Sequence, residues 1–181
     1  MALREDQIVR YGRQILLREL GGRGQERLLA TSVRVRASGP AIDEAVAWLL
    51  AGGTPLVLPA VFPGGGFLTG VDPGTLNPDA TPVTSPSIEL LPRTERSDSP
   101  AQVVVGAGVA FRTPAACDGC WEQTLARLPE GPVPAGAGSL AALAVQRLVL
   151  GWSAPLGLVL WTGSRFETPL LPPCPHPAKH S

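Results

Sequence analysis

The pattern of hydrophobic and polar positions along this chain predicts an α/β protein that opens with helices. Apolar residues recur at helical spacing from Glu5 to Leu20, and Gly21-Gly22 ends the pattern. A second, short helix is expected from Gln25 to Ala30. It leads into Ser32 to Arg36, where polar and apolar residues alternate as in a strand with one polar face. Residues 4–30 therefore predict a helical arm that precedes the first strand.

The next segment predicts a strand, a helix and a second strand. After the turn at Ser38-Gly39, a helix is expected from Ala41 to Ala51, with Pro40 at its first position and Gly52-Gly53 at its end. Leu56 to Leu58 follows as a short strand. Because two parallel strands joined by a helix form a right-handed crossover, this unit predicts the start of a Rossmann-like sheet.

The middle of the chain is poor in regular patterns. Residues 59–100 are dominated by Pro, Gly, Ser, Thr and Asp, and they predict a loop region with one weak strand at Ile88 to Leu91. Order resumes at Gln102 to Val105, which is typical of a buried strand. Val109 to Phe111 is expected to continue that strand beyond a bend at Gly106-Ala107-Gly108.

These glycines do not predict a phosphate-binding loop. Such a loop needs a further glycine where Phe111 stands, and a helix directly after it. Thr113-Pro114 prevents that helix from following.

The last third predicts two helices and a hairpin. A short helix is expected from Trp121 to Arg127, and a longer one is expected to begin at a Ser139 cap and to end at Gly151. Gly157 to Trp161 and Phe166 to Leu170 then read as a terminal β-hairpin. The prediction is one α/β domain, residues 1–181, with a reduced Rossmann-like, mostly parallel sheet, N-terminal helices and a C-terminal β-hairpin.

Composition and charge narrow the function classes. Fifteen basic and fifteen acidic residues cancel, so no net field favours nucleic acid. The apolar stretch from Leu140 to Trp161 is interrupted by charged and helix-breaking residues, which argues against a membrane span, and the N-terminus lacks a secretory signal. We therefore expect a cytoplasmic protein without nucleic-acid or membrane partners. Three cysteines in a reducing compartment favour a metal site or inert thiols over disulfides.

One run of the sequence carries a family resemblance. RYGRQILLRELGGRGQERLL, from Arg10 to Leu29, resembles the N-terminal signature of the ThiF, MoeB and HesA family, the bacterial relatives of ubiquitin-activating enzymes. Cys117 to Trp121 is similar to the first zinc pair of that family, Gly136 to Gly151 is similar to the helix after its substrate loop, and Cys174 falls where its second zinc pair lies. The resemblance implies an enzyme that adenylates the C-terminus of a ubiquitin-like or sulfur-carrier protein.

The resemblance fails at the nucleotide site. The family has a glycine-rich turn after its first strand, but here that turn, residues 37–42, keeps only Gly39. Pro40 removes an amide donor and Ile42 replaces the last glycine. Leu58-Pro59 stands where the family has an acidic residue for the ribose. We therefore expect ATP not to bind conventionally, and the chain to be a shortened, catalytically inactive member of this family.

The resemblance also implies a structural zinc site. Its ligands would be Cys117, Cys120, Cys174 and His176, with His180 as the alternative fourth ligand, because Pro177 stands where the family has its last cysteine. Zinc held in this way would tether the tail, residues 172–181. Two other interpretations stay open: the thiols bind no metal and the tail is loose, or one cysteine is a nucleophile. The second lacks a histidine in a recognisable base arrangement.

Arg10 and Arg13 admit two interpretations. In the dimeric family an arginine of the N-terminal helix reaches into the partner's nucleotide site, and Arg13 matches it best. Alternatively, both arginines only solvate the outer face of a helix. The favoured function is an inactive subunit that pairs with an intact ThiF/MoeB-like enzyme, or with itself, and donates Arg13. The alternatives are an active adenylyltransferase and a non-catalytic protein-binding module.

Overall fold

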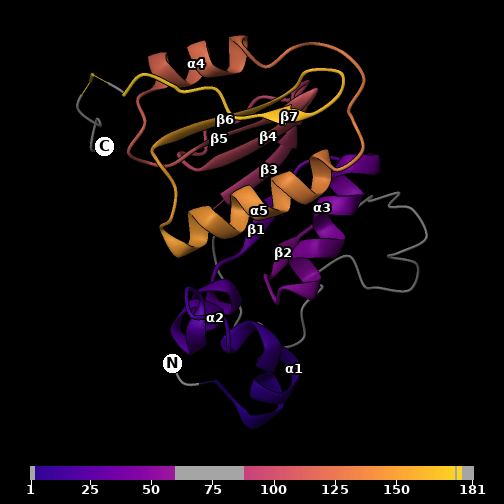
Figure 1. Ribbon diagram of the computed structural model, residues 1–181, viewed down its shortest axis with the longest axis vertical. Coiled ribbons are helices and arrows are strands. Elements are labelled where there is room, and N and C mark those ends of the chain that lie inside the picture. Colours follow the sequence, from indigo (N-terminus) through magenta and orange to yellow (C-terminus); the bar gives the residue numbers. More distant parts are fainter. Residues whose placement is uncertain (1–2, 60–87, 174, 177–181) are drawn as a thin grey trace.

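The computed structural model describes residues 3–59, 88–173, 175 and 176, and it contains an α/β fold (Figure 1). The strands form one seven-stranded sheet in the order β2-β1-β3-β4-β5-β6-β7. The elements, in chain order, are α1 (Glu5–Ile15), α2 (Gly21–Ala30), β1 (Val33–Val35), α3 (Pro40–Ala51), β2 (Leu56–Val57), β3 (Ile88–Pro92), β4 (Gln102–Gly106), β5 (Gly108–Arg112), α4 (Asp118–Ala126), α5 (Ala137–Leu150), β6 (Leu156–Trp161) and β7 (Phe166–Glu167).

The sheet is mostly parallel in strand direction. β2, β1, β3 and β4 are parallel neighbours, whereas β5, β6 and β7 join through antiparallel pairs. Because two reversals restore direction, β6 points the same way as the first four strands, and only β5 and β7 oppose them. This confirms the predicted Rossmann-like α/β sheet with N-terminal helices and a C-terminal β-hairpin.

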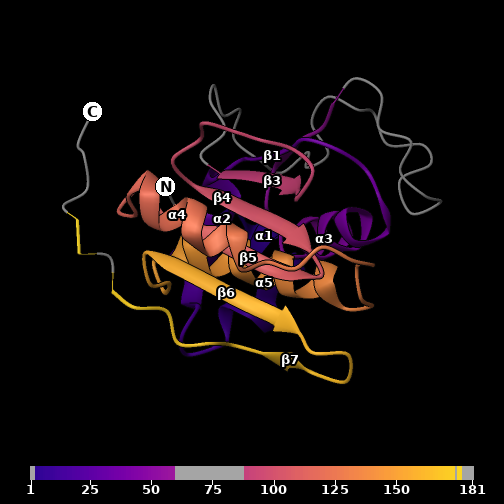
Figure 2. The same ribbon diagram turned by 90° about the horizontal axis from the view of Figure 1, so that it is seen from above.

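Helices cover both faces of the sheet, which gives three layers (Figure 2). The larger core lies between the sheet and the α3–α5 pair, where alternate side chains of β1, β3 and β4 meet Val46 and Leu49 of α3 and Val145 of α5. The smaller core lies under α4, where Trp121 and Leu125 pack on the opposite face. Each central strand is therefore buried on two faces, as its apolar sequence requires.

The helical arm lies at the amino ends of the parallel strands, because α2 leads directly into β1 (Figure 1). The expected helix from Glu5 to Leu20 was too long: α1 ends at Ile15, and Gly21-Gly22, expected to end a helix, begins α2. Gly24 of α2 allows this helix to pack closely against α5. A Cβ on Gly24 would lie 2.7 Å from Leu20 Cδ1 and 3.2 Å from Leu150 Cδ2, so the close approach of α2 to α5 needs a glycine there.

Two further expectations are corrected. Val109 to Phe111 does not continue β4 but returns beside it as β5, through a turn at Ala107 that pairs Gly106 with Gly108. Ser139 does not cap α5, which begins at Ala137 after Gly136 in the left-handed conformation. The expected end at Gly151 is confirmed, because its left-handed φ of 73° ends the helix. None of the described helices is both long and apolar enough to cross a bilayer.

Candidate functional site

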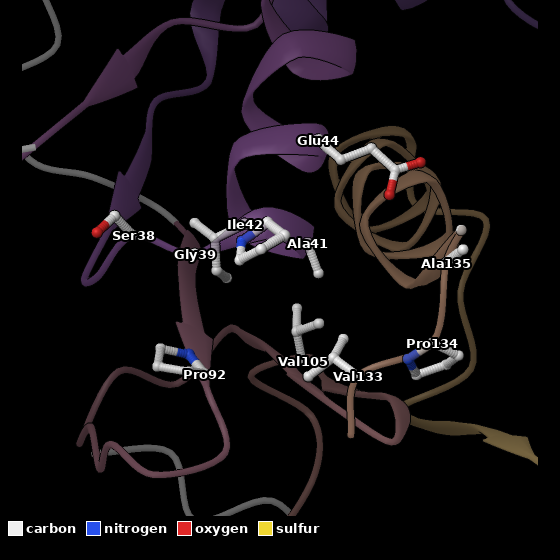
Figure 3. A pocket seen from close by; sticks show the side chains of 12 residues that line it. Ser38, Gly39, Ala41, Ile42, Glu44, Pro92, Val105, Val133, Pro134 and Ala135 are labelled. Atoms are coloured by element: carbon white, nitrogen blue, oxygen red, sulfur yellow. The ribbon is translucent and has the colours of Figure 1, made fainter. Parts of the chain in front are cut away.

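A cavity of about 740 Å³ lies at the carboxyl ends of the parallel strands, opposite the helical arm (Figure 3). β1 continues through α3 to β2 on one side and is flanked by β3 on the other, so the strand order reverses at this point. Open α/β sheets bind ligands in the crevice that such a reversal creates. The residues that line the cavity are Ser38, Gly39, Pro40, Ala41, Ile42, Glu44, Pro92, Val105, Val133, Pro134, Ala135 and Gly136.

The wall formed by the β1–α3 turn does not have the geometry of a phosphate cradle. Gly39 has a φ of 151°, and its amide donates to Asp43 Oδ1 at 3.4 Å, so one backbone donor is already used within the turn. Pro40 has no amide hydrogen. Ile42 is buried in the core between α3 and the sheet, at a position where a glycine would allow closer packing of the helix on the strand. The turn therefore offers few free backbone donors on this wall of the cavity.

Glu44 is the cavity residue that sequence reasoning missed. Its side chain extends from α3 toward the first turn of α5, where it accepts a hydrogen bond from Ser139 Oγ (Figure 3). A Cβ on Gly138 would lie 2.8 Å from Glu44 Oε2, so the carboxylate lies directly against that turn. A negative charge at a helix N-terminus is stabilising. The chain's own carboxylate thus occupies an end of α5 that would otherwise attract an external anion.

The metal-ligand prediction is tested only in part by the described residues. Cys117, Cys120 and His176 come together, with their ligand atoms within 4.8 Å of one another. His176 Nδ1 lies 3.4 Å from Cys117 Sγ and 3.7 Å from Cys120 Sγ. The other expected ligands, Cys174 and His180, lie outside the described residues.

The three-residue cluster fits a tetrahedral metal. Zinc–sulfur and zinc–nitrogen bonds of about 2.3 and 2.05 Å at a tetrahedral angle imply a sulfur–nitrogen separation of about 3.6 Å. The two sulfur–nitrogen separations in the cluster, 3.4 and 3.7 Å, lie on either side of this value. α4 fixes the cysteine pair, because Cys117 is its N-cap residue and the Cys120 amide donates to Cys117 Sγ at 3.3 Å. Zinc bound here would join the C-terminal tail to the start of α4.

Arg13 is exposed on α1 and makes no ion pair with another described residue. Arg10 is also exposed, and its guanidinium lies 5.5 Å from the ring centre of Tyr11. Both arginines are thus at the surface of the arm, at the opposite end of the sheet from the cavity of their own chain. The geometry is compatible with either interpretation of Arg13 given above.

Other residues of the Arg10–Leu29 run are structural. Tyr11 and Gln25 are buried at 1% and 0% exposure, and Gln25 Nε2 donates to Gly52 O at 3.0 Å. Tyr11 and Gln25 thus connect the arm to the turn between α3 and β2, where they contact Gly53 and Gly52. Part of the recognisable sequence is therefore explained by this junction, which neither periodicity nor composition indicated.

Comparisons with known proteins support the fold. No protein-family model matches the sequence, and neither does any curated protein sequence. Among solved structures, PaaA matches with a TM-score of 0.56 and 13% identity, over 92% of this chain and 84% of that one. E. coli MccB with succinimide matches with a TM-score of 0.56 and 11% identity, over 93% and 73% of the two chains. E. coli MccB with AMPCPP and selenomethionyl MccA matches with 0.55 and 10%, over the same shares. Identities this low show a shared fold alone.

Proposed function

We propose that this protein is a catalytically inactive subunit of ThiF/MoeB-like fold, which pairs with an intact activating enzyme or with a second copy of itself. In this role it supports the activation of a ubiquitin-like or sulfur-carrier protein without performing the adenylation. The proposal joins the sequence resemblance at Arg10–Leu29 to the altered site at the carboxyl end of β1.

The observation that carries the proposal is the chemistry of the cavity wall. Adenylyl transfer depends on donors and cations that position the phosphates and stabilise the charge of the transition state. Among the described residues, the only charged side chain that lines the cavity is Glu44, which would repel a triphosphate. Pro40 removes an amide donor, and Ile42 stands where a glycine would allow close packing of the helix on the strand. A conventional adenylation site would need the opposite charge and an open glycine turn.

A second feature supports pairing. Leu17, Leu143 and Trp152 are exposed at 55%, 49% and 45%, and they line one hollow of about 440 Å³ between the arm and the end of α5. We call this hollow the arm groove. Two further exposed apolar side chains are Leu16 of the arm, at 85%, and Trp48 of α3, at 57%. Apolar surface that is gathered in this way is typical of protein interfaces.

The competing function is ATP-dependent adenylation at an unconventional site. It is favoured by a cavity of ligand size at the strand-order reversal, and by the likeness to an MccB structure that contains AMPCPP. Titration calorimetry with MgATP and a pyrophosphate-exchange assay distinguish the two functions. We expect no heat of binding and no exchange, whereas ATP-dependent exchange by the purified protein would overturn the proposal.

Arg13 is proposed to act in the active site of the partner. An arginine supplied in trans to a phosphoryl-transfer site contributes about 10³- to 10⁵-fold to the rate. We therefore expect Arg13→Ala to lower the rate of an intact ThiF/MoeB-like partner and to leave pairing unchanged. The matched control is Arg18→Ala, an exposed arginine of the connection between α1 and α2. Equal partner rates with both variants would remove Arg13 from the proposal, and failure to pair would remove the proposal itself.

We propose that the cluster of Cys117, Cys120 and His176 binds zinc in a structural role. Cys117, Cys120 and Cys174 would supply three thiolate ligands, and His176, with His180 as the alternative, would supply the fourth ligand. A site closed by four protein ligands has no open position for a reactant. Its contribution would be to hold the tail against α4.

A further inference from the structure

The cavity at the carboxyl ends of β1, β3 and β4 has the size of a ligand site, but its apolar lining and its carboxylate do not suit a nucleotide. Its volume of about 740 Å³ lies within the usual range for small-molecule sites. Figure 3 shows Ala41 and Ile42 on one side of it, and Val105 and Val133 on the other. Val133 is 48% exposed, so about half of this apolar lining residue is open to solvent. Such a surface favours a ligand with an apolar body.

The charge of the cavity decides which polar group that ligand can carry. The N-termini of α3 and α5 both lie at its wall, and they would attract an anion if they were free. Each already has a carboxylate of its own chain: Asp43 accepts from the Gly39 amide, and Glu44 accepts from Ser139 Oγ. The two carboxylates therefore repel an incoming anion at the helix N-termini, which would attract it if the carboxylates were absent.

Glu44 has capacity left for a donor. A carboxylate can accept about four hydrogen bonds, and within the described chain Ser139 is its one side-chain donor. No described lysine, arginine or histidine pairs with Glu44. Glu44 is only partly buried and lines the cavity, so a ligand in the cavity can approach it.

We propose that this cavity binds a small apolar ligand that carries an ammonium group, with Glu44 as the counter-charge and Ile42, Val105 and Val133 around the apolar body. The inference is separate from pairing, and it concerns the opposite end of the sheet from the arm groove. The proposed ligand of the cavity is thus an organic cation and not a nucleotide. No covalent step is involved.

The test uses three probes that share one apolar body. Phenethylamine is a cation, 2-phenylethanol is neutral and 3-phenylpropionate is an anion. Binding is followed at neutral pH by ¹H–¹⁵N NMR of the full chain with each probe at up to about 5 mM, a range suited to weak ligands. We expect phenethylamine to shift the amides of residues 38–42 and 135–139. We also expect it to bind about tenfold more tightly than 3-phenylpropionate, with the alcohol between them.

Variants locate the site. Glu44→Gln keeps a hydrogen-bond acceptor for Ser139 and removes the charge, so it should reduce the preference for the amine to about twofold or less. Glu122→Gln is the matched control, because Glu122 is an exposed carboxylate on α4, away from the cavity, and should leave the preference unchanged. Val133→Trp should fill part of the cavity and weaken the binding of all three probes. Thermal unfolding of each variant shows whether it is folded.

The outcomes separate the two proposals. Absence of shifts with every probe, equal binding of amine and alcohol, or shifts confined to other surfaces would each overturn the ammonium site. None of these results bears on pairing or on inactivity. Conversely, MgATP-induced shifts at residues 38–42 together with pyrophosphate exchange would overturn the proposed inactivity, whatever phenethylamine does.

Discussion

Gly53 makes the junction between the arm and the sheet possible at the scale of one residue. Its φ is +85°, and an added Cβ would lie 2.8 Å from Tyr11 Cζ and 3.0 Å from Gln25 Nε2. Gly53→Ala therefore combines a strained backbone with overpacking of two buried side chains. We expect it to lower the free energy of unfolding by about 2–4 kcal/mol, measured by urea denaturation.

Gly12→Ala is the control for that substitution. Gly12 lies within α1, and a Cβ there would meet no heavy atom within 4 Å. Alanine is the better helix former, so this variant should gain about 0.5–1 kcal/mol. If both variants change stability by the same amount, the Tyr11–Gln25–Gly53 contact does not hold the arm.

Residue-level prediction from sequence succeeded where a single residue restricts its own backbone. Pro40 at the first turn of α3 and Gly151 at the end of α5 are in the expected places. It failed where a partner distant in the sequence decides the role. Ser139 resembles a helix cap, but its hydroxyl donates to Glu44, which is 95 residues away in the chain. Local rules for caps cannot anticipate such a contact.

At the level of elements, Cys117, Cys120 and His176 bring the start of α4 next to the segment that follows β7. We expect the purified protein to contain about one zinc ion per chain, and Cys117→Ser or His176→Ala to lower this below about a tenth. Gln123→Ala, an exposed position on α4, should keep it. Elemental analysis by mass spectrometry gives the content. Cys174→Ser then tests whether the thiol of Cys174 is also a ligand.

Removal of the metal should affect the tail more than the sheet. Chelation is expected to speed amide hydrogen exchange at residues 168–176, and to leave β4 and β5 unchanged, because those strands are buried between two layers. Unchanged exchange in the tail of the zinc-free protein would contradict a tethering role. So would an equal increase throughout the sheet, because that would make the metal necessary for the whole fold.

The elements themselves were mostly predictable, and the error at β5 has a physical cause. Gln102 to Arg112 is apolar on both sides of Gly106-Ala107-Gly108, and a pattern of period two looks the same for one bent strand and for two antiparallel strands. The deciding feature is the left-handed φ of +158° at Gly108, where a Cβ would lie 2.2 Å from Val159 O. Contact with β6, some fifty residues later, thus selects the hairpin.

At the scale of the whole molecule, the two ends of the parallel strands have different chemistry. The carboxyl ends form an apolar cavity with one carboxylate, and the amino ends carry the arm with its arginines and exposed leucines. The sequence resemblance includes the arm, whereas the departures from the family include the turn at residues 37–42 and Leu58-Pro59. Glu44 of α3 reaches the start of α5 because these two helices pack together. That packing cannot be predicted from the sequence of either helix alone.

The arm groove is expected to be the surface through which the protein associates with its partner. Leu17→Glu and Leu143→Glu place a charge in the groove from two different elements, the α1–α2 connection and α5. If the groove is the pairing surface, either variant should weaken association by at least about tenfold, because an unpaired charge would be desolvated on binding. Both positions are about half exposed, so the free energy of unfolding should change by less than about 1 kcal/mol.

Leu170→Glu is the control, because Leu170 is 96% exposed and lies beyond β7, outside the groove. Sedimentation over a concentration series distinguishes the 18.8 kDa chain from larger species, alone and with an intact ThiF/MoeB-like enzyme. Pairing through the groove requires wild type and Leu170→Glu to associate equally while both groove variants dissociate. A wild-type chain that stays monomeric and ignores the enzyme would exclude the subunit role. Association that survives both groove variants would move the interface to another face.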